Sequence, residues 1–247
     1  MIFGENSQKS KIENRKSKIM KILSLSTAEQ GCSLAIADKS SLLYEEYWTN
    51  KKTHSLRLLK MIAHAMENRV NLTLKDIDLF VVAKGPGSFT GLRIGISVIK
   101  GLGHAMDRPV RGISSLDGIA FRFYSSFVPV FAMMDARRGE VYCALYHFHN
   151  GRLISKSPEQ ALKPEDAVET VKNESVLFAG TGAKLYQDII MEKAKKPLFS
   201  YNLYDSVNAA ALIQSFHSGH SADSNLHPQD SMVPNYIRKS DAELNRA

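Results

Sequence analysis

The sequence has little cysteine: Cys32 and Cys143 are its only two, and they lie far apart in the chain. Each stands within an apolar run, and neither has the close paired spacing that a structural zinc site needs. A disulfide-stapled scaffold is therefore excluded. We expect two buried thiols in a reducing compartment, and we predict no metal site.

Long hydrophobic runs are also missing. No stretch approaches the roughly 20 apolar residues that a membrane-spanning helix needs, and the first 19 residues are polar and basic without the apolar core of a secretory signal. We therefore expect a cytoplasmic protein with no membrane partner. Residues 1–19 show no periodic pattern and are predicted to form a disordered basic tail, dispensable for the fold, with Met20 as a candidate natural start.

Established catalytic motifs are absent as well: the sequence has no G-x-S-x-G elbow and no H-E-x-x-H helix. The histidine pairs His147/His149 and His217/His220 have no third ligand at metal-site spacing, so we interpret them as surface residues. The net charge of +7 and the pI of about 9.3 permit a nucleic-acid partner. No RNA-reading motif accompanies them, and we expect any contact with RNA to be indirect.

What the chain does have is a regular alternation of apolar runs and helical patterns. The expected strands cover residues 20–26, 32–37, 42–48, 78–83, 109–113, 128–134, 141–148, 152–155 and 175–179. The expected helices cover residues 54–70, 91–106, 164–172, 182–194 and 206–217. This order repeats a βββαβα unit, which predicts a duplicated α/β architecture with a cleft between its lobes. We place the lobes at residues 20–125 and 126–247, and the helix at 206–217 is a candidate to pack back on the first lobe.

A glycine-rich loop lies between an expected buried strand and the helix at 91–106. Its residues are Gly85, Pro86, Gly87, Ser88, Phe89, Thr90 and Gly91, and Arg93 follows in the first helical turn. Backbone amides, two hydroxyls and a guanidinium at a helix start could bind an anion or the phosphates of a nucleotide. A tight turn that permits close packing of helix and strand explains the same residues equally well.

Two further segments carry weaker signals of the same kind. Gly180 and Gly182 again lie between a strand and a helix, although packing is the simpler explanation for them. Asp135 ends a buried strand, where a carboxylate could hold a metal or water, or could cap a turn and pair with a neighbouring arginine. Ser26 and Thr27, after the first strand, complete the candidate nucleotide-binding residues.

The two helices of the first lobe are apolar over more than the usual stripe of a surface helix. Burial under other parts of the same lobe would explain this width. A second explanation is that one face packs on the sheet and another is covered by a different protein. The residues that we assign to such a partner interface are Leu58, Ile62, Ala65, Met66, Ile96, Ile99 and Gly103.

Several segments occur in the order seen in one known family. They are MKILSLST from residue 20, GPGSFTGLRIG from residue 85, MDARRGEVY from residue 134, GTGAKLY from residue 180 and PNYIR from residue 234. On these segments the chain resembles the TsaB (YeaZ) family over about residues 20–238. The second and third segments are highly specific, and the others are supportive.

The resemblance implies an α/β fold of the actin/hexokinase/Hsp70 (ASKHA) type, made of two RNase-H-like lobes. It implies a TsaD-type catalytic partner and a TsaE-type ATPase, which together form threonylcarbamoyladenosine in tRNAs that read codons starting with A. Contact with tRNA would be indirect, through the complex. First-lobe helices would meet the partner, and the same surface would pair with a second copy when the chain is alone.

Two departures favour a non-catalytic subunit. Catalytic relatives hold a metal with an H-x-x-x-H pair in the first lobe, whereas this chain has only His54, His64 and His104 there. Many family members also place an aspartate in the first strand–turn segment, where this chain has Leu25. We therefore expect no catalytic residue and no cofactor beyond weak binding of ATP or ADP. The alternatives are an ATP-dependent, kinase-like enzyme of the same fold and an inactive homologue of a metallopeptidase.

Overall fold

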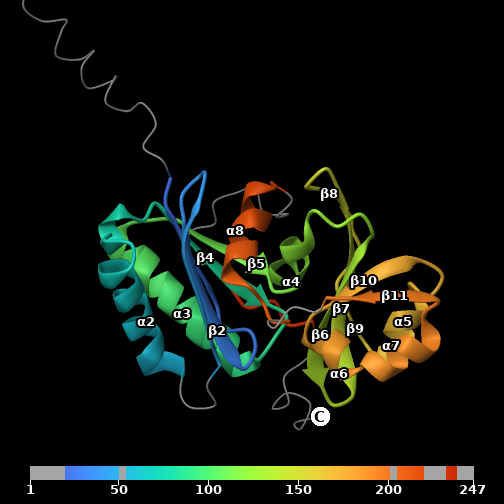
Figure 1. Ribbon diagram of the computed structural model, residues 1–247. Helices are drawn as coiled ribbons and strands as arrows, with labels where there is room; N and C mark the ends of the chain where they lie inside the picture. The colour runs from blue at the N-terminus through green and yellow to red at the C-terminus, as the bar shows by residue number, and fades with distance from the viewer. Residues whose placement is uncertain (1–19, 50–53, 201–204, 220–231, 238–247) are drawn as a thin grey trace, which may run out of the picture.

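The computed structural model describes residues 20–49, 54–200, 205–219 and 232–237, and Figure 1 shows their arrangement. The predicted tail at residues 1–19 lies outside the described residues. Two twisted β-sheets lie side by side, each with helices packed against it. The first sheet comes from the N-terminal half of the sequence and the second from the C-terminal half.

The first sheet has the strand order β3-β2-β1-β4-β5. Its strands are β1 (Ile22–Ser26), β2 (Gly31–Ala37), β3 (Leu42–Thr49), β4 (Leu79–Gly85) and β5 (Val110–Ser114). β2 runs antiparallel to both β1 and β3, whereas β1, β4 and β5 are parallel to one another. Every residue of β1 and β2 is buried, because these strands are covered on both faces, and their sequences are accordingly almost wholly apolar or small.

Helices cover both faces of the first sheet. Figure 1 shows α2 (His54–Asn68) and α3 (Phe89–Met106) on one side and α8 (Ala209–His217) on the other. The side chain of Ser88 caps the start of α3 by accepting a hydrogen bond from the amide of Gly91. The helix ends where Asp107 adopts a left-handed conformation, and its amide bonds back to the carbonyl of Gly103.

The second sheet repeats the order of the first, as β8-β7-β6-β10-β11. Its strands are β6 (Val130–Arg137), β7 (Glu140–His149), β8 (Arg152–Lys156), β10 (Ser175–Ala179) and β11 (Lys196–Phe199), and the short β9 (Gln160–Leu162) also pairs with β7. The antiparallel and parallel pairs fall at the same places as in the first sheet. This duplication confirms the predicted α/β, ASKHA-type fold class.

The two halves exchange their last helices. The short α4 (Asp117–Ala120) follows β5 in the chain and packs against β6 of the second sheet as well as against β5. In return, α8 follows the second sheet in the chain but packs against β1, β2 and β4 of the first. The two helices also contact each other. One hydrophobic core therefore runs through both halves, with a smaller core behind the second sheet.

Most predicted elements are present, with shifted ends. The expected helix at 182–194 is instead two helices, α6 (Thr181–Leu185) and α7 (Gln187–Lys193), because Tyr186 between them leaves the helical conformation. The helix expected at 206–217 begins at Ala209, where the side chain of Asn208 caps it. The helix α5 (Pro164–Glu169) is shorter than predicted. None of the helices in the described part of the chain is long and apolar enough to cross a membrane.

Five short elements were not predicted from the sequence. These are β9, β11, α4 and the 3-10 turns η1 (Leu74–Asp76) and η2 (Phe121–Phe123). Each has five residues or fewer, which is too short to display a helical or strand period.

Candidate functional site

The carboxyl ends of the parallel strands of both sheets meet at the junction between the halves. Four connections lie there: the turn after β1, the glycine loop after β4, the turn after β6 and the loop after β10. A hydrogen bond of 2.6 Å from the Thr181 hydroxyl to Glu29 Oε1 joins the first and last of these connections. In α/β proteins ligands bind at such strand ends, so this junction is the candidate functional site.

The glycines of the loop after β4 are required by close backbone contacts. A Cβ added to Gly91 would lie 2.1 Å from the carbonyl oxygen of Thr27, and one added to Gly87 would lie 2.5 Å from that of Ala28. At Gly85, where φ is +118°, the added atom would lie 2.3 Å from the carbonyl oxygen of Asn235. The structure therefore supports the packing explanation for these glycines.

The polar groups of the same loop are already engaged within the chain. The Ser88 amide donates to the carbonyl of Ala28 at 2.7 Å, and the Thr27 hydroxyl donates to the carbonyl of Gly91 at 2.7 Å. These bonds tie the turn after β1 to the start of α3. Ser26 Oγ accepts from the Ala28 amide, whereas Thr90 is exposed at the helix surface.

Arg93 is held by a segment from the end of the chain. Its Nε donates to the Tyr236 hydroxyl at 3.2 Å, and its guanidinium lies 3.7 Å from the centre of the Phe89 ring. Tyr236 in turn stacks on Phe89, and the amide of Asn235 donates to the carbonyl of Lys84 at 2.6 Å. Residues 232–237 therefore lie against the start of α3 and engage the side chain of Arg93.

The second glycine loop and Asp135 also have structural roles. A Cβ added to Gly180, where φ is +110°, would lie 2.2 Å from the carbonyl oxygen of Met133, and Gly182 is also packed against this strand. Asp135 Oδ1 accepts from the amide of Arg137 at 2.8 Å. Asp135 thus caps the turn after β6, one of the two roles that the sequence left open for it.

Glu29 is the acidic residue of this junction that the sequence analysis missed. Its Oε1 accepts from Thr181, and its Oε2 accepts from the amide of Val207 at 2.7 Å. Burial raises the pKa of this carboxyl to about 7, while both hydrogen bonds lower it and the nearby Asp135 and Asp205 raise it further. Leu25 is apolar at the position where many family members have an aspartate, and Glu29, later in the same turn, places a carboxyl at this junction.

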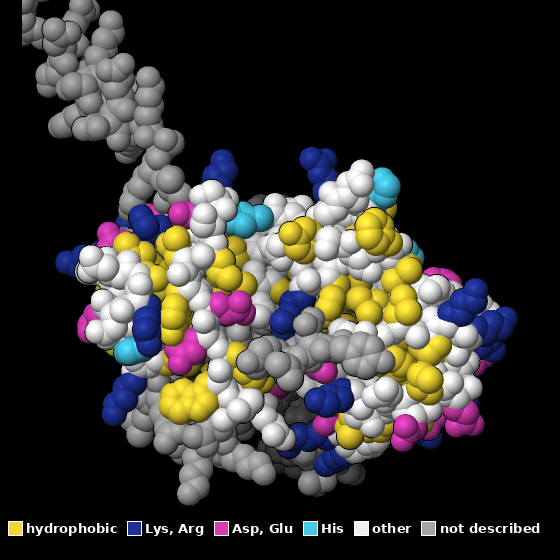
Figure 2. Space-filling model, in the orientation of Figure 1, with side chains coloured by type: hydrophobic (Ala, Val, Ile, Leu, Met, Phe, Trp, Pro, Cys, Tyr) yellow, Lys and Arg dark blue, Asp and Glu magenta, His cyan; other side chains and the backbone are white. Residues whose placement is uncertain are grey.

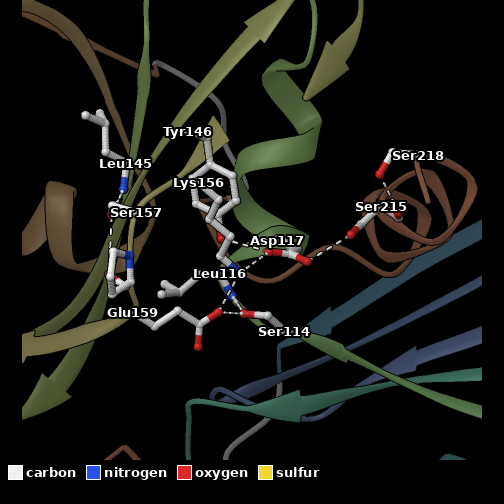
Figure 3. A network of polar contacts seen from close by, with 11 residues as sticks. Ser114, Leu116, Asp117, Leu145, Tyr146, Lys156, Ser157, Glu159, Ser215 and Ser218 are labelled. Atoms are coloured by element: carbon white, nitrogen blue, oxygen red, sulfur yellow. Dashed lines mark hydrogen bonds and ion pairs between the residues drawn. The ribbon is translucent and has the colours of Figure 1, made fainter. Parts of the chain in front are cut away.

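A second polar cluster, separate from Glu29, also joins the halves (Figure 3). The Asp117 carboxylate, at the start of α4, accepts from the Tyr146 hydroxyl at 2.8 Å, from Lys156 Nζ at 2.7 Å and from the Ser215 hydroxyl at 2.8 Å. Lys156 also bonds Glu159 at 2.6 Å, and the Ser114 hydroxyl donates to the same carboxylate. The cluster thus connects β5, α4 and α8 with β7 and β8.

Lys156 is the cation that faces both carboxylates of this second cluster. Burial alone would lower the pKa of Lys156, but attraction to Asp117 and Glu159 raises it above its usual value. Burial and the same two carboxylates raise the pKa of Tyr146 well above the ordinary range. A lysine that is held protonated between two carboxylates is a poor general base, so we assign this cluster to holding the halves together.

The seven residues assigned to a partner interface require correction. Their side chains, or the Cα of Gly103, are buried within the chain itself: Leu58, Ile62, Ala65, Met66, Ile96, Ile99 and Gly103. They lie on the inner faces of α2 and α3, which pack on the first sheet. The outer faces instead carry Leu59, which is 52% exposed, and the exposed or partly exposed Ala63, Ile94, Val98, Gly101 and Leu102.

The two cysteines are buried structural residues. Both cysteines are free and buried, and burial raises the pKa of Cys32 to about 11 and that of Cys143 to about 12. Within the described residues no group of three or more histidine, cysteine, aspartate or glutamate side chains could hold a metal ion. On the face shown in Figure 2, basic and acidic side chains lie close together at the end formed by α5 and α7.

The family model described as "TsaD: tRNA N6-adenosine threonylcarbamoyltransferase" matches residues 48–246 of the chain. The chain is 35% identical over 176 residues to the "tRNA threonylcarbamoyladenosine biosynthesis protein TsaB" of Bacillus subtilis, covering 69% of this chain and 75% of that protein. It is 33% identical over 175 residues to the TsaB protein of Escherichia coli, with the same coverage.

Solved structures agree with these sequence relatives. A Pseudomonas aeruginosa protein with similarity to the peptidase YeaZ superposes with a TM-score of 0.74 at 28% identity, covering 89% of this chain and all of that one. A second structure, of YeaZ from the same organism, gives a TM-score of 0.72 at 27% identity, covering 88% of this chain and all of that one.

Proposed function

This chain belongs to the TsaB (YeaZ) family, and we propose that it takes part in the biosynthesis of threonylcarbamoyladenosine in tRNA. The observation that carries the proposal is its 33–35% identity with TsaB proteins of two bacteria, over three quarters of their length. We further propose that it acts as a non-catalytic subunit that binds a TsaD-type threonylcarbamoyltransferase, together with a TsaE-type ATPase. Contact with tRNA is then made through the complex.

Several features of this chain favour the role of a non-catalytic subunit. The sequence contains no H-x-x-x-H pair of the kind that holds the metal in catalytic relatives. The loop and turn groups that could bind phosphates donate instead to neighbouring backbone carbonyls, as Thr27 and Ser88 do. Lys156 is paired with carboxylates on two sides.

The outer faces of α2 and α3 are the docking surface that we propose for the partner. The two helices contact each other, so their outer residues form one surface on the first half. Leu59 provides an exposed apolar side chain, and Gly101 has open space where a side chain would be, which allows another helix to approach closely. In the absence of the partner, we expect a second copy to occupy the same surface as an isologous dimer.

A reconstituted modification assay tests the proposed function. Threonylcarbamoyladenosine in tRNA is measured by mass spectrometry of its nucleosides, with the TsaD- and TsaE-type proteins present and this chain either added or omitted. We expect efficient modification only when the chain is added. Equal modification without it, or steady ATP turnover by the chain alone near the enzyme median of about 10 s⁻¹, contradicts the proposal.

A charge-insertion pair tests the docking surface. Leu59→Glu is expected to abolish co-purification with the TsaD-type partner, because a carboxylate in an apolar contact must be desolvated. The matched control is Leu185→Glu, since Leu185 on α6 is similarly exposed at 58% but lies in the second half. If both variants bind the partner as the wild type does, the docking surface lies elsewhere while the proposed function stands.

A further inference from the structure

The two helices of the proposed docking surface contain almost no acidic residues. No aspartate or glutamate occurs within Phe89–Met106, and Glu67, in the last turn of α2, is the only one within His54–Asn68. The basic residues of the same two segments are Arg57, Lys60, Arg93 and Lys100. Four basic residues against one acidic residue give this pair of helices a positive net charge at pH 7.

The described cations of this surface are solvated rather than paired. Lys60 is exposed and Lys100 is partly exposed, and no carboxylate within the residues that the structure describes pairs with either. Arg93 is exposed and is held by two neutral aromatic side chains. By contrast, Lys172 pairs with Glu169 at the surface of the second half. The positive charge of α2 and α3 is therefore left for another molecule to meet.

Apolar groups lie beside these cations. Leu59, next to Lys60 on α2, is 52% exposed. On α3, Arg93 and Lys100 are about two helical turns apart on one line of the helix surface, and the partly exposed Ile94 and Val98 follow the adjacent line. An apolar centre with a charged rim is typical of a contact with a protein. A nucleic acid would offer its phosphates to the cations but little to the apolar centre.

We propose that this surface selects an acidic protein partner, an inference that rests on the proposed function. The TsaD-type protein then presents aspartate or glutamate side chains opposite Lys60, Arg93 and Lys100, around an apolar contact with Leu59. A second copy of this chain brings one positive surface against another, so it is the weaker occupant. The charges thus set the order of preference between the two occupants.

Salt separates the two occupants because it screens attraction and repulsion alike. The Debye length is about 10 Å at 0.1 M salt and about 3 Å at 1 M. Added salt therefore slows association with an acidic partner and strengthens association between two copies of this chain. The two associations should respond to salt in opposite directions, although they use the same surface.

The full wild-type chain is tested at about 0.05 M and about 0.5 M sodium chloride, which span this range of screening. Stopped-flow fluorescence measures the rate of association with the TsaD-type protein, and sedimentation equilibrium measures self-association. We expect the association rate to fall about ten-fold at the higher concentration. Self-association should tighten over the same interval.

Charge reversal provides an independent measurement. Lys60→Glu combined with Lys100→Glu should weaken binding to the TsaD-type protein by about ten-fold or more. At low salt the same variant should self-associate more tightly than the wild type, because the repulsion is removed, whereas a folding defect would weaken both associations. The matched control is Lys195→Glu combined with Lys196→Glu, which makes the same change in net charge at two exposed positions of the second half. It should leave both associations close to those of the wild type.

The outcomes keep this inference apart from the proposed function. If the wild type does not bind the TsaD-type protein at either salt concentration, the proposed function fails and the inference fails with it. Binding that does not respond to salt, or wild-type self-association that weakens with salt, overturns the inference alone. So does a Lys60→Glu, Lys100→Glu variant that binds the partner like the wild type but has lost affinity for tRNA, since the cations then serve RNA. If wild-type copies do not self-associate at all, the partner measurements decide.

Discussion

The ammonium nitrogen of Lys156 lies 2.7 Å from Oδ1 of Asp117, and this contact joins the last residue of β8 to the first residue of α4. The same ammonium lies 2.6 Å from Glu159. Because α4 belongs to the first half of the sequence and β8 to the second, one cation pairs with two carboxylates at the boundary between the halves.

Lys156→Met is expected to destabilise the protein by about 2–4 kcal/mol, because it leaves Asp117 and Glu159 poorly hydrated without a cation. Lys172→Met is the control, since Lys172 pairs with Glu169 at an exposed site and should contribute less than about 1 kcal/mol. Urea unfolding at pH 7 measures both. Equal losses in the two variants would show that the Asp117 cluster does not hold the halves together.

Two glycines of α3 should respond in opposite directions to alanine. Gly91→Ala places a methyl group 2.1 Å from the carbonyl oxygen of Thr27, and a cost of about 1–3 kcal/mol is expected from overpacking. Gly101→Ala enters open space within the same helix and should stabilise the chain by about 0.5–1 kcal/mol. Thermal unfolding of both variants tests this; a stabilising Gly91→Ala would contradict the close packing of the loop.

Tyr236→Ala should cost about 1–2 kcal/mol, because it removes the stacking on Phe89 and the hydrogen bond from Arg93. Val233→Ala in the same segment is the control, since Val233 is 69% exposed and its truncation should change stability by less than about 0.5 kcal/mol. Denaturant midpoints compare the two. A neutral Tyr236→Ala would mean that residues 232–237 contribute nothing to holding α3.

Both thiols should be nearly inert in the folded protein. Burial raises the pKa of Cys32 to about 11 and that of Cys143 to about 12, so at pH 8 their thiolate fractions are far below that of a free cysteine. We expect reaction with an aromatic disulfide reagent to be at least about 100-fold slower than for a small thiol. In guanidinium chloride both should react rapidly, and fast reaction of the folded chain would show that a cysteine is accessible.

Much of the fold could be predicted from the sequence because local patterns carry it. The apolar composition of Leu79–Gly85 predicts a buried strand, and the helical period of Phe89–Met106 predicts a long helix. The repeated order of such strands and helices indicates the duplication. The glycines of the loop after β4 were recognised as a special site, but their two explanations could be separated only by the carbonyl oxygens of Thr27 and Ala28.

The residues of the candidate site were harder to predict because distant segments define them. Glu29 meets Thr181 and Val207, which lie 152 and 178 residues away in the chain. The interface assignment was wrong for a different reason: alanine and glycine on the outer face of a helix widen its apolar pattern without marking which side meets the sheet. Ile62 and Ile99 are therefore core residues, although the pattern made them resemble a docking seam.

The packing of α4 and α8 across the two halves affects how the chain folds during synthesis and whether it can be split into fragments that fold. The first sheet leaves the ribosome early, yet one of its faces stays uncovered until α8, near the other end of the sequence, has been synthesised. Contacts between such distant segments slow folding. A gene cut at the boundary of the duplication would yield two fragments, each missing the helix that the other encodes. The repeat in the sequence is thus not a pair of separable folding units.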